Sequence, residues 1–421
     1  MLGELSHRSG WYVTRADHFY YIVIEVIVIN KYIISLEEAI TYQNFYNALK
    51  KCNDDVSYKF SVQEYDLNCA TYIHDSITSI LNGEIPYVRK VLRIIIKERG
   101  KERIITPIYI GDRVIQKVLC DNVLIPSIMP HLIYDNGASI KGKGVDFARQ
   151  RVDKFIEDAK RHYGVDNIYI VSFDVKSYFD TIPHALCKHV LDRYIYDDRI
   201  SRLVMGIIES YHLAEIKELE IDDDERNVMI DDLFAHKCNG ICLGSQISQI
   251  MAGAVLNEFD HYIKDILRVK YYERYMDDGL IICKSKQEAN ELLDKLHVCI
   301  ESLGLQFNRK KTRVIKASKG FEFLKVKYTI KSDSKTVKRL NHRGIAVQKR
   351  KLRSFRDKVD NGRMTLDDVY NSMQSWLSHS KVAKNSYKSV KSVLDLYDDL
   401  FGGYKLTKKY FKAHPEVKKK K

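Results

Sequence analysis

Several short segments in the middle of the chain are apolar on one or both faces of an extended backbone, and this pattern predicts strands. One is "IYIVSF", which leads into Asp174, and two more flank the turn of "RYMDDGLIICK" (274–284). "VLRIIIKERGKERIITPIYI" (91–110) predicts a hairpin with a basic turn, and "GFEFLKVKY" (320–328) predicts a further strand. We therefore expect a sheet in the middle of the chain.

Apolar residues at helical spacing predict helices around and between these strands. The first follows a capping box formed by Ser35 and Glu38. Other helices are expected at about 62–82, 112–128 and 183–194, and within 239–267 and 289–312. The acidic stretch 215–232 is interpreted as an exposed hairpin. The order of these elements matches a split βαβ sheet with helices on one face.

The composition is typical of a globular protein, with 45% hydrophobic and 30% charged residues. The apolar run "FYYIVIEVIVIN" (19–30) is too short to cross a bilayer and contains Glu25, so we expect a buried strand, no membrane association and no secretion signal. The eight cysteines lack the paired spacing of a zinc site. These features predict a cytoplasmic protein with reduced cysteines.

The positive charge is concentrated toward the C-terminal end. The net charge is +13, and residues 331–421 contain 24 Lys/Arg against 9 Asp/Glu, so the basic excess lies entirely in that segment. Such a segment suits a polyanion, most simply the phosphates of a nucleic acid. The alternative is a solubilising surface, and composition alone does not separate the two.

The adjacent carboxylates Asp277 and Asp278 lie in an apolar setting, where they repel each other. If the strand that ends at Asp174 neighbours their hairpin, three carboxylates converge at one end of the sheet. Such a cluster raises its own pKa values, and two Mg²⁺ ions, with Mn²⁺ as a substitute, would neutralise it. Two such metals serve nucleotidyl transfer. The letters YMDD alone are a weak signal, since an ordinary acidic turn also explains them.

Seven motifs in order resemble those of the reverse transcriptases, within them the bacterial branch that includes group II intron enzymes. The similar segments are "KERIITPIYIGDRVIQKVL", "YDNGASIKGKGVDFARQ", "FDVKSYFDTIPH", "GICLGSQISQIMAGAVLNEFDH", "RYMDDGLI", "LGLQFNRKKT" and "FEFLKVKY". The resemblance implies an α+β right-hand polymerase with fingers, a palm on a split βαβ antiparallel sheet, and a helical thumb. The implied domains are an N-terminal helical extension (1–88), fingers (89–166), palm (167–330), basic helical thumb (331–402) and basic tail (403–421).

The resemblance also implies roles for single residues. The expected metal ligands are Asp174, the Val175 carbonyl, Asp277 and Asp278. The expected dNTP-binding residues are Lys97, Arg103, Phe179, Leu243 and Gly244. Phe179 would clash with a 2′-hydroxyl and so favour deoxynucleotides. Lys311, with Lys310 as a rival, matches a lysine near the leaving pyrophosphate, and Phe323 and Leu324 match the primer grip. The alternatives are a solvated hairpin face for Lys97 and Arg103 and a core role for Phe179.

Two positions depart from the family pattern. Leu243 stands where many reverse transcriptases have glutamine, and Ser248-Gln249 replaces the usual Ser-Pro. The enzymes of diversity-generating retroelements and the defence-associated bacterial reverse transcriptases share this kind of departure. Because the residue at 243 would contact the base-pairing region, we expect unusual template choice and fidelity.

The expected function is therefore RNA-directed DNA polymerisation that copies a dedicated non-coding RNA into cDNA. No endonuclease, RNase H or protease pattern accompanies the palm, so the resemblance is greatest to free-standing enzymes of antiphage defence. The expected partners are the RNA template, the cDNA product and dNTPs, while the oligomeric state stays open. The alternatives are the reverse transcriptase of a diversity-generating retroelement, an RNA-dependent RNA polymerase and an RNA-binding scaffold.

Overall fold

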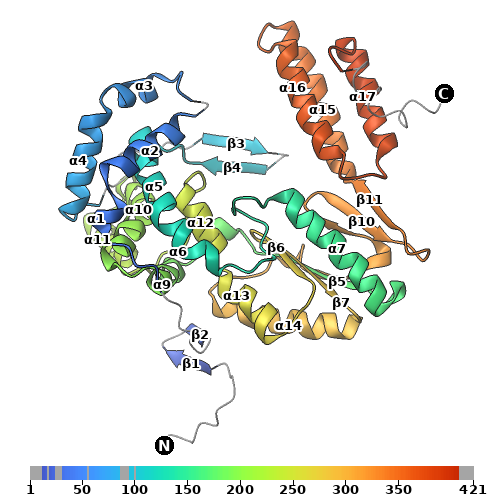
Figure 1. Cartoon of the computed structure of the whole chain (residues 1–421), viewed down its shortest axis with the longest axis horizontal. Coiled ribbons are helices and arrows are strands. Elements are labelled where there is room, and N and C mark those ends of the chain that lie inside the picture. The colour runs from blue at the N-terminus through green and yellow to red at the C-terminus, as the bar shows by residue number, and fades with distance from the viewer. Residues whose placement is uncertain are drawn as a thin grey trace, which may run out of the picture. The chain divides into compact units, whose positions relative to one another are not determined.

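A computed structural model describes residues 12–16, 19–23, 31–54, 56–85, 94–98 and 101–406 (Figure 1). These residues combine helices with antiparallel strand pairs, in agreement with the expected α+β class. The chain divides into two compact units. The first comprises Met1–Ala148, Phe173–Gly279 and Glu291–Thr312, and the second comprises Arg149–Ser172, Leu280–Asn290 and Arg313–Lys421.

The largest of the described sheets has four strands in the order β6-β7-β5-β8. Their bounds are β5 Tyr169–Asp174, β6 Tyr272–Tyr275, β7 Asp278–Cys283 and β8 Arg313–Lys316. The hairpin of β6 and β7 lies beside β5, although about a hundred residues separate them in sequence, and β5 runs antiparallel to β8. The split sheet that the sequence predicted is therefore present, and Asp174 ends its strand as expected.

The other described strands form smaller sheets. Strands β1 (Tyr12–Ala16) and β2 (Phe19–Val23) make one pair, and β3 (Ile94–Glu98) and β4 (Lys101–Ile105) make the predicted hairpin. A three-stranded sheet has the order β11-β10-β9. Its strands are β9 Phe321–Phe323, β10 Val326–Ile330 and β11 Thr336–Leu340. The remainder of the apolar run at 24–30 lies outside the described residues.

Helices account for most of the first unit. They are α1 Leu36–Ala39, α2 Tyr42–Asn53, α3 Phe60–Leu67, α4 Cys69–Leu81, α5 Ile110–Leu119, α6 Ile125–Ile128, α8 Tyr178–Thr181, α9 His184–Tyr194, α10 Asp198–Lys217, α11 Asp223–Phe234, α12 Gln246–Ala254 and α13 Asn257–His261. Helix α7 (Val145–Tyr163) begins in this unit, and α14 (Lys286–Ser302) ends in it. The helices predicted near 112–128, 183–194 and 289–312 are thus present, whereas the single helix predicted at about 62–82 is two helices, α3 and α4, divided at Asn68.

The interpretation of the acidic stretch 215–232 as a hairpin was wrong, because this stretch is helical. Helix α10 continues to Lys217, and α11 begins at Asp223. Asp222 is the N-cap of α11, and its side chain accepts a hydrogen bond from the Glu225 N–H at 2.8 Å. Acidic residues in a first helical turn also interact favourably with the helix dipole. The acidic cluster therefore marks a helix start and not a turn between strands.

In the second unit, α15 (His342–Asp360), α16 (Leu366–Ser380) and α17 (Tyr387–Phe401) lie side by side (Figure 1). Their shared core contains Leu352, Phe355, Val369, Met373, Leu377, Val393, Leu394 and Tyr397. The segment 331–402 was expected to be helical, yet it begins with strand β11, so its helical part starts only at His342. No helix in the described ranges is long and apolar enough to cross a membrane.

Helix α7 packs along the three-stranded sheet of the second unit (Figure 1). Lys160 donates hydrogen bonds to the Ser334 carbonyl at 2.7 Å and to the Thr336 hydroxyl at 2.6 Å, and Lys338 forms an ion pair with Asp153. The segment 320–328 was expected to be one strand, but it reverses direction at Leu324-Lys325. Both residues have positive φ, 45° and 70°, which apolar periodicity does not reveal.

Candidate active site

The three predicted carboxylates come from two neighbouring strands and the turn beside them. Asp174 is the last residue of β5, Asp278 is the first of β7, and Asp277 lies in the turn between β6 and β7. The Val175 N–H donates a hydrogen bond to the Asp277 carbonyl at 3.3 Å, which ties the two chain segments together. The structure therefore brings these aspartates to one end of the sheet, as the sequence pattern predicted.

The negative charges of this cluster are close enough to affect one another. Burial raises the pKa of Asp278 to about 7, and the nearby charges of Asp277 and Asp174 and a hydrogen bond with Asp174 add to the shift. Lys311 forms an ion pair with Asp174, whose side chain is buried. Burial lowers the pKa of Lys311, but its hydrogen bond to Asp174 and the surrounding carboxylates outweigh this and raise the pKa overall. One ammonium group thus leaves part of the negative charge uncompensated.

The chemistry of this donor set fits a divalent cation, because hard carboxylate oxygens are the ligands that Mg²⁺ prefers. The raised pKa of Asp278 supports a cation site here. The Asp278 carboxyl keeps its proton because too little positive charge compensates the neighbouring carboxylates, and a bound cation would supply that charge. In the described part of the chain, no three His, Cys, Asp or Glu side chains are already grouped closely enough to hold a metal ion. Binding would therefore require the carboxylates to move together and Lys311 to release Asp174.

A buried ion pair that sequence reasoning missed holds the turn between β6 and β7. Arg274 and Asp260 are both fully buried, and the guanidinium binds the carboxylate through Nε at 2.7 Å and Nη2 at 2.6 Å. Arg274 Nη1 donates to the Met276 carbonyl at 2.9 Å, and Nη2 also donates to the Gly253 carbonyl at 2.9 Å. Arg274 therefore connects the turn before Asp277 to helices α12 and α13. The sequence shows a charged residue, Arg274, directly before the YMDD motif. It does not show that the partner is Asp260, which lies 14 residues earlier.

The hairpin of β6 and β7 is also constrained by sterics. Met276 has φ 54°, a left-handed conformation that non-glycine residues adopt at a cost of about 1–2 kcal/mol. Directly after the aspartates, a Cβ on Gly279 would lie 2.0 Å from the Phe173 ring. Phe173 packs in turn against Phe259 and Phe307, with ring centroids 5.6 Å and 5.0 Å away. A core of aromatic rings thus packs against the hairpin next to the carboxylates. It leaves no space for a side chain at position 279, so this position requires glycine.

Three of the predicted dNTP-binding residues lie on segments that are joined by backbone hydrogen bonds. The Phe179 carbonyl accepts from the Ile241 N–H at 2.8 Å, and the Leu243 carbonyl accepts from the Thr106 N–H at 3.0 Å, just after β4. Gly244 has φ 124°, and a Cβ there would lie 2.6 Å from the Thr106 carbonyl. The glycine loop (239–245) is therefore fixed between the segment that follows Asp174 and the base of the β3–β4 hairpin.

The remaining predicted residues stay predictions. In the β3–β4 ladder, Ile96 is opposite Arg103 and Lys97 is opposite Glu102. Residues that are directly opposite each other share a face of the ladder. Positions 97 and 103 therefore fall on opposite faces of the β3–β4 ladder. Phe323 is buried in the second unit, where the Leu324 carbonyl accepts a hydrogen bond from Arg149 Nη2 at 2.5 Å. Neither observation tests a role in binding dNTP or primer.

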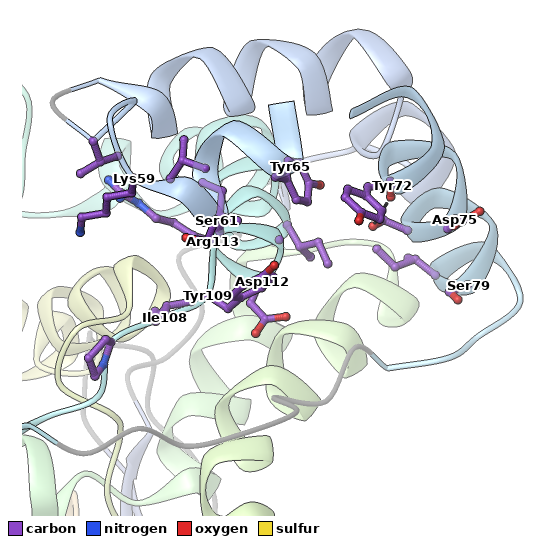
Figure 2. Close-up of a pocket in the computed structure, with 18 of the residues that line it drawn as sticks. Lys59, Ser61, Tyr65, Tyr72, Asp75, Ser79, Ile108, Tyr109, Asp112 and Arg113 are labelled. Carbon is purple, nitrogen blue, oxygen red and sulfur yellow. Dashed lines mark hydrogen bonds between the residues drawn. The ribbon is translucent and has the colours of Figure 1, made fainter. Parts of the chain in front are cut away.

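A cavity of about 850 Å³ lies between α3, α4 and the start of α5 (Figure 2). The rings of Tyr65 and Tyr72 lie next to each other along it, with centroids 5.2 Å apart, and Lys59 and Arg113 gather toward one end. Among the described residues that line this cavity, none was predicted to take part in catalysis or nucleotide binding. We therefore assign no part of the reaction to it.

Comparison with known proteins agrees with this geometry. The sequence profile of the family "Reverse transcriptase (RNA-dependent DNA polymerase)" matches residues 95–328, which is more than half of the chain and includes the three aspartates. Protein YkfC of Escherichia coli (strain K12) is 25% identical over 189 residues, 37% of this chain and 45% of that protein. This chain thus spans less than half the length of that relative.

Two solved structures of telomerase are also similar. Telomerase from Candida albicans, in complex with a fragment of telomeric RNA, has a TM-score of 0.40 and 11% identity, covering 83% of this chain and 68% of that one. Apo telomerase from Candida tropicalis has a TM-score of 0.38 and 12% identity, covering 80% and 64%. On the family match, this chain belongs to the reverse transcriptases, the RNA-dependent DNA polymerases, and has their α+β right-hand fold.

Proposed function

We propose that the protein is an RNA-directed DNA polymerase that copies a dedicated non-coding RNA into cDNA and acts in antiphage defence. The observation that carries the polymerase activity is the meeting of Asp174, Asp277 and Asp278 at one sheet end, inside a matched reverse transcriptase domain. The basic helix α15 and its neighbours supply a surface suited to nucleic acid phosphates.

In this proposal, Asp174, Asp277, Asp278 and the Val175 carbonyl would hold two divalent cations. When bound, such cations activate the primer hydroxyl and stabilise the leaving pyrophosphate. Lys311 stays protonated because its pKa is raised, so it can leave Asp174 and bind the pyrophosphate as a cation. Phe179 would lie under the sugar, while Lys97 and Arg103 would bind the triphosphate.

The dedicated template and the defence role rest on narrower support. Leu243 and Gln249 depart from the common motif in the way seen in diversity-generating and defence-associated enzymes, and both lie on or next to the glycine loop. A diversity-generating reverse transcriptase is therefore the second candidate. An RNA-dependent RNA polymerase and a non-catalytic RNA-binding scaffold are the remaining alternatives.

The test is to purify the protein from cells that carry its native flanking DNA and to sequence the bound RNA and any cDNA. We expect one structured RNA and complementary DNA, with the cDNA lost in Asp277→Asn and retained in the surface control Asp231→Asn. Phage plating should show protection that Asp277→Asn removes. The same RNA with protection intact in Asp277→Asn would identify a scaffold, and incorporation of ribonucleotides in place of deoxynucleotides would identify an RNA polymerase.

A further inference from the structure

One backbone carbonyl in the glycine loop accepts hydrogen bonds from two histidine side chains. His184 Nε2 lies 2.8 Å from the Gly240 carbonyl oxygen, and His212 Nε2 lies 3.0 Å from the same atom. A carbonyl can only accept, so both ring nitrogens must carry a proton and donate it. The two rings meet edge to face, with centroids 5.1 Å apart. They come from different helices, α9 and α10, and converge on one peptide group.

The environment of His184 fixes its protonation state. His184 is fully buried, and burial lowers its pKa to about 4, so the ring is neutral at physiological pH. Its Nδ1 has no hydrogen-bond partner among the described residues, which leaves Nε2 as the protonated nitrogen. Burying an unsatisfied ring nitrogen costs stability, and the hydrogen bond from Nε2 to the Gly240 carbonyl offsets part of that cost. His212 is half-buried, and its Nδ1 lies 3.7 Å from Glu215.

The peptide group that the histidines hold is connected directly to the proposed nucleotide site. Gly240 C=O and Ile241 N–H belong to the same planar peptide unit. The N–H of that unit donates to the Phe179 carbonyl at 2.8 Å, so the plane is held by histidines at one end and by Phe179 at the other. Two residues further on, the Leu243 carbonyl accepts from Thr106. A rotation of this peptide would move both Phe179 and Leu243.

We propose that His184 and His212 form a two-histidine clamp on the Gly240 carbonyl, and that this clamp positions Phe179 and Leu243 for selection of the incoming nucleotide. The two histidines are positioning residues, because neither touches the reacting atoms. The inference rests on the proposed nucleotide-binding role of Phe179 and Leu243.

The first test compares single-nucleotide primer extension on an RNA template by the parent, His212→Leu and His212→Gln. Glutamine keeps an N–H donor at similar reach, whereas leucine removes it. Losing a buried hydrogen bond on a positioning group should raise the dNTP KM roughly tenfold in His212→Leu, with a smaller change in kcat. Discrimination against ribonucleotides should fall in parallel, and His212→Gln should restore much of both. The corresponding pair at His184 should show a larger effect because that ring is fully buried.

The matched control is His189→Leu. His189 lies on the same helix α9, but its Nε2 hydrogen-bonds Glu258 at 2.9 Å and not the glycine loop. It should leave the dNTP KM and the discrimination unchanged. Unchanged values in a folded His212→Leu, or a glutamine variant no better than leucine, would overturn the clamp.

A second measurement does not depend on activity. Hydrogen exchange at the Ile241 amide should accelerate several-fold in His212→Leu and return toward the parent rate in His212→Gln, because the amide shares the clamped peptide. If the parent extends no primer while this exchange pattern holds, the polymerase proposal fails and the clamp stands as a structural device without a role in selection. If the amide exchanges equally in all three proteins, the clamp itself is wrong.

Discussion

Two hairpin turns, one in each unit, place non-glycine residues in the left-handed region. In the hairpin of β6 and β7 Met276 has φ 54°, and in the hairpin of β9 and β10 Leu324 and Lys325 have φ 45° and 70°. Each turn has a carbonyl bound by a buried arginine: Arg274 donates to Met276, and Arg149 donates to Leu324. The same strained turn is thus stabilised by the same kind of side chain at two sites.

The two arginines differ in how far they lie in sequence from the carbonyl that each one binds. Arg274 lies two residues from the carbonyl it holds, and Asp260 binds its guanidinium, with both side chains fully buried. Arg149 lies on α7, 175 residues from Leu324 in sequence, and its Nη2 is 3.5 Å from His379 Nδ1. The turn at Met276 is therefore held by an arginine from its own strand, whereas the turn at Leu324 is held by an arginine from helix α7.

The largest expected effect separates the two arginines by stability. Arg274→Met leaves Asp260 charged and buried without its partner, which should lower the free energy of unfolding by about 3–5 kcal/mol. The loss of the hydrogen bond from Arg149 to the Leu324 carbonyl should alone cost about 1–3 kcal/mol in Arg149→Met. Urea denaturation followed by circular dichroism measures both variants. Adding Asp260→Asn to Arg274→Met should recover part of the loss, and a double variant that is no more stable than Arg274→Met would contradict the role of the buried ion pair.

A second difference is electrostatic, because the turn at Met276 leads directly into the cluster of Asp174, Asp277 and Asp278. The pKa of Asp278 is raised from 3.8 to about 7. Between these values the folded state binds a proton that the unfolded chain has released, so this group favours folding at low pH and its contribution is lost as the pH rises toward 7. In EDTA, Asp278→Asn should therefore melt at a higher temperature than the parent at pH 8.

The stabilising effect of Asp278→Asn should shrink as the pH is lowered toward 4, since the folded parent carboxyl is then protonated and the unfolded one is close to its own pKa of 3.8. Thermal melts at several pH values between 4.5 and 8 measure this, with Asp231→Asn on α11 as the exposed control. A stabilisation that does not change with pH would show that like-charge repulsion and burial do not act on Asp278 as described.

The smallest expected effect concerns the strain in the turn at Leu324 and Lys325. Lys325→Gly should raise the free energy of unfolding by about 0.5 kcal/mol, because glycine adopts positive φ without steric penalty, which outweighs its greater entropy in the unfolded chain. The control Lys327→Gly changes an exposed residue within strand β10 and should instead lower stability by about 0.5–1 kcal/mol. A destabilising Lys325→Gly would mean that the loss of the side-chain contacts of Lys325 outweighs the relief of its positive φ.

Local sequence patterns predicted most helices and strands. The predictions were wrong where the same residues are compatible with two kinds of local structure. The hairpin at 94–105 and the helices near 62–82 and 183–194 follow from periodicity, which any short window contains. The prediction of a hairpin at 215–232 was wrong because aspartates such as Asp222 favour both turns and helix starts. The prediction of one strand at 320–328 was wrong because neither Leu324 nor Lys325 is a residue type that commonly adopts a left-handed conformation. Arg149, which binds the Leu324 carbonyl, is also distant in sequence.

By itself the sequence determined that two adjacent aspartates lie at a tight turn between two strands, that a third ends a buried strand, and that a family of polymerases shares this order. These are properties of spacing and polarity along a short stretch of chain. Only the tertiary structure decided that Arg274 meets Asp260, that Lys311 pairs with Asp174 and that two histidines share the Gly240 carbonyl. A buried polar group takes whichever partner the packing of distant elements brings within hydrogen-bond distance, and sequence periodicity carries no information about that partner.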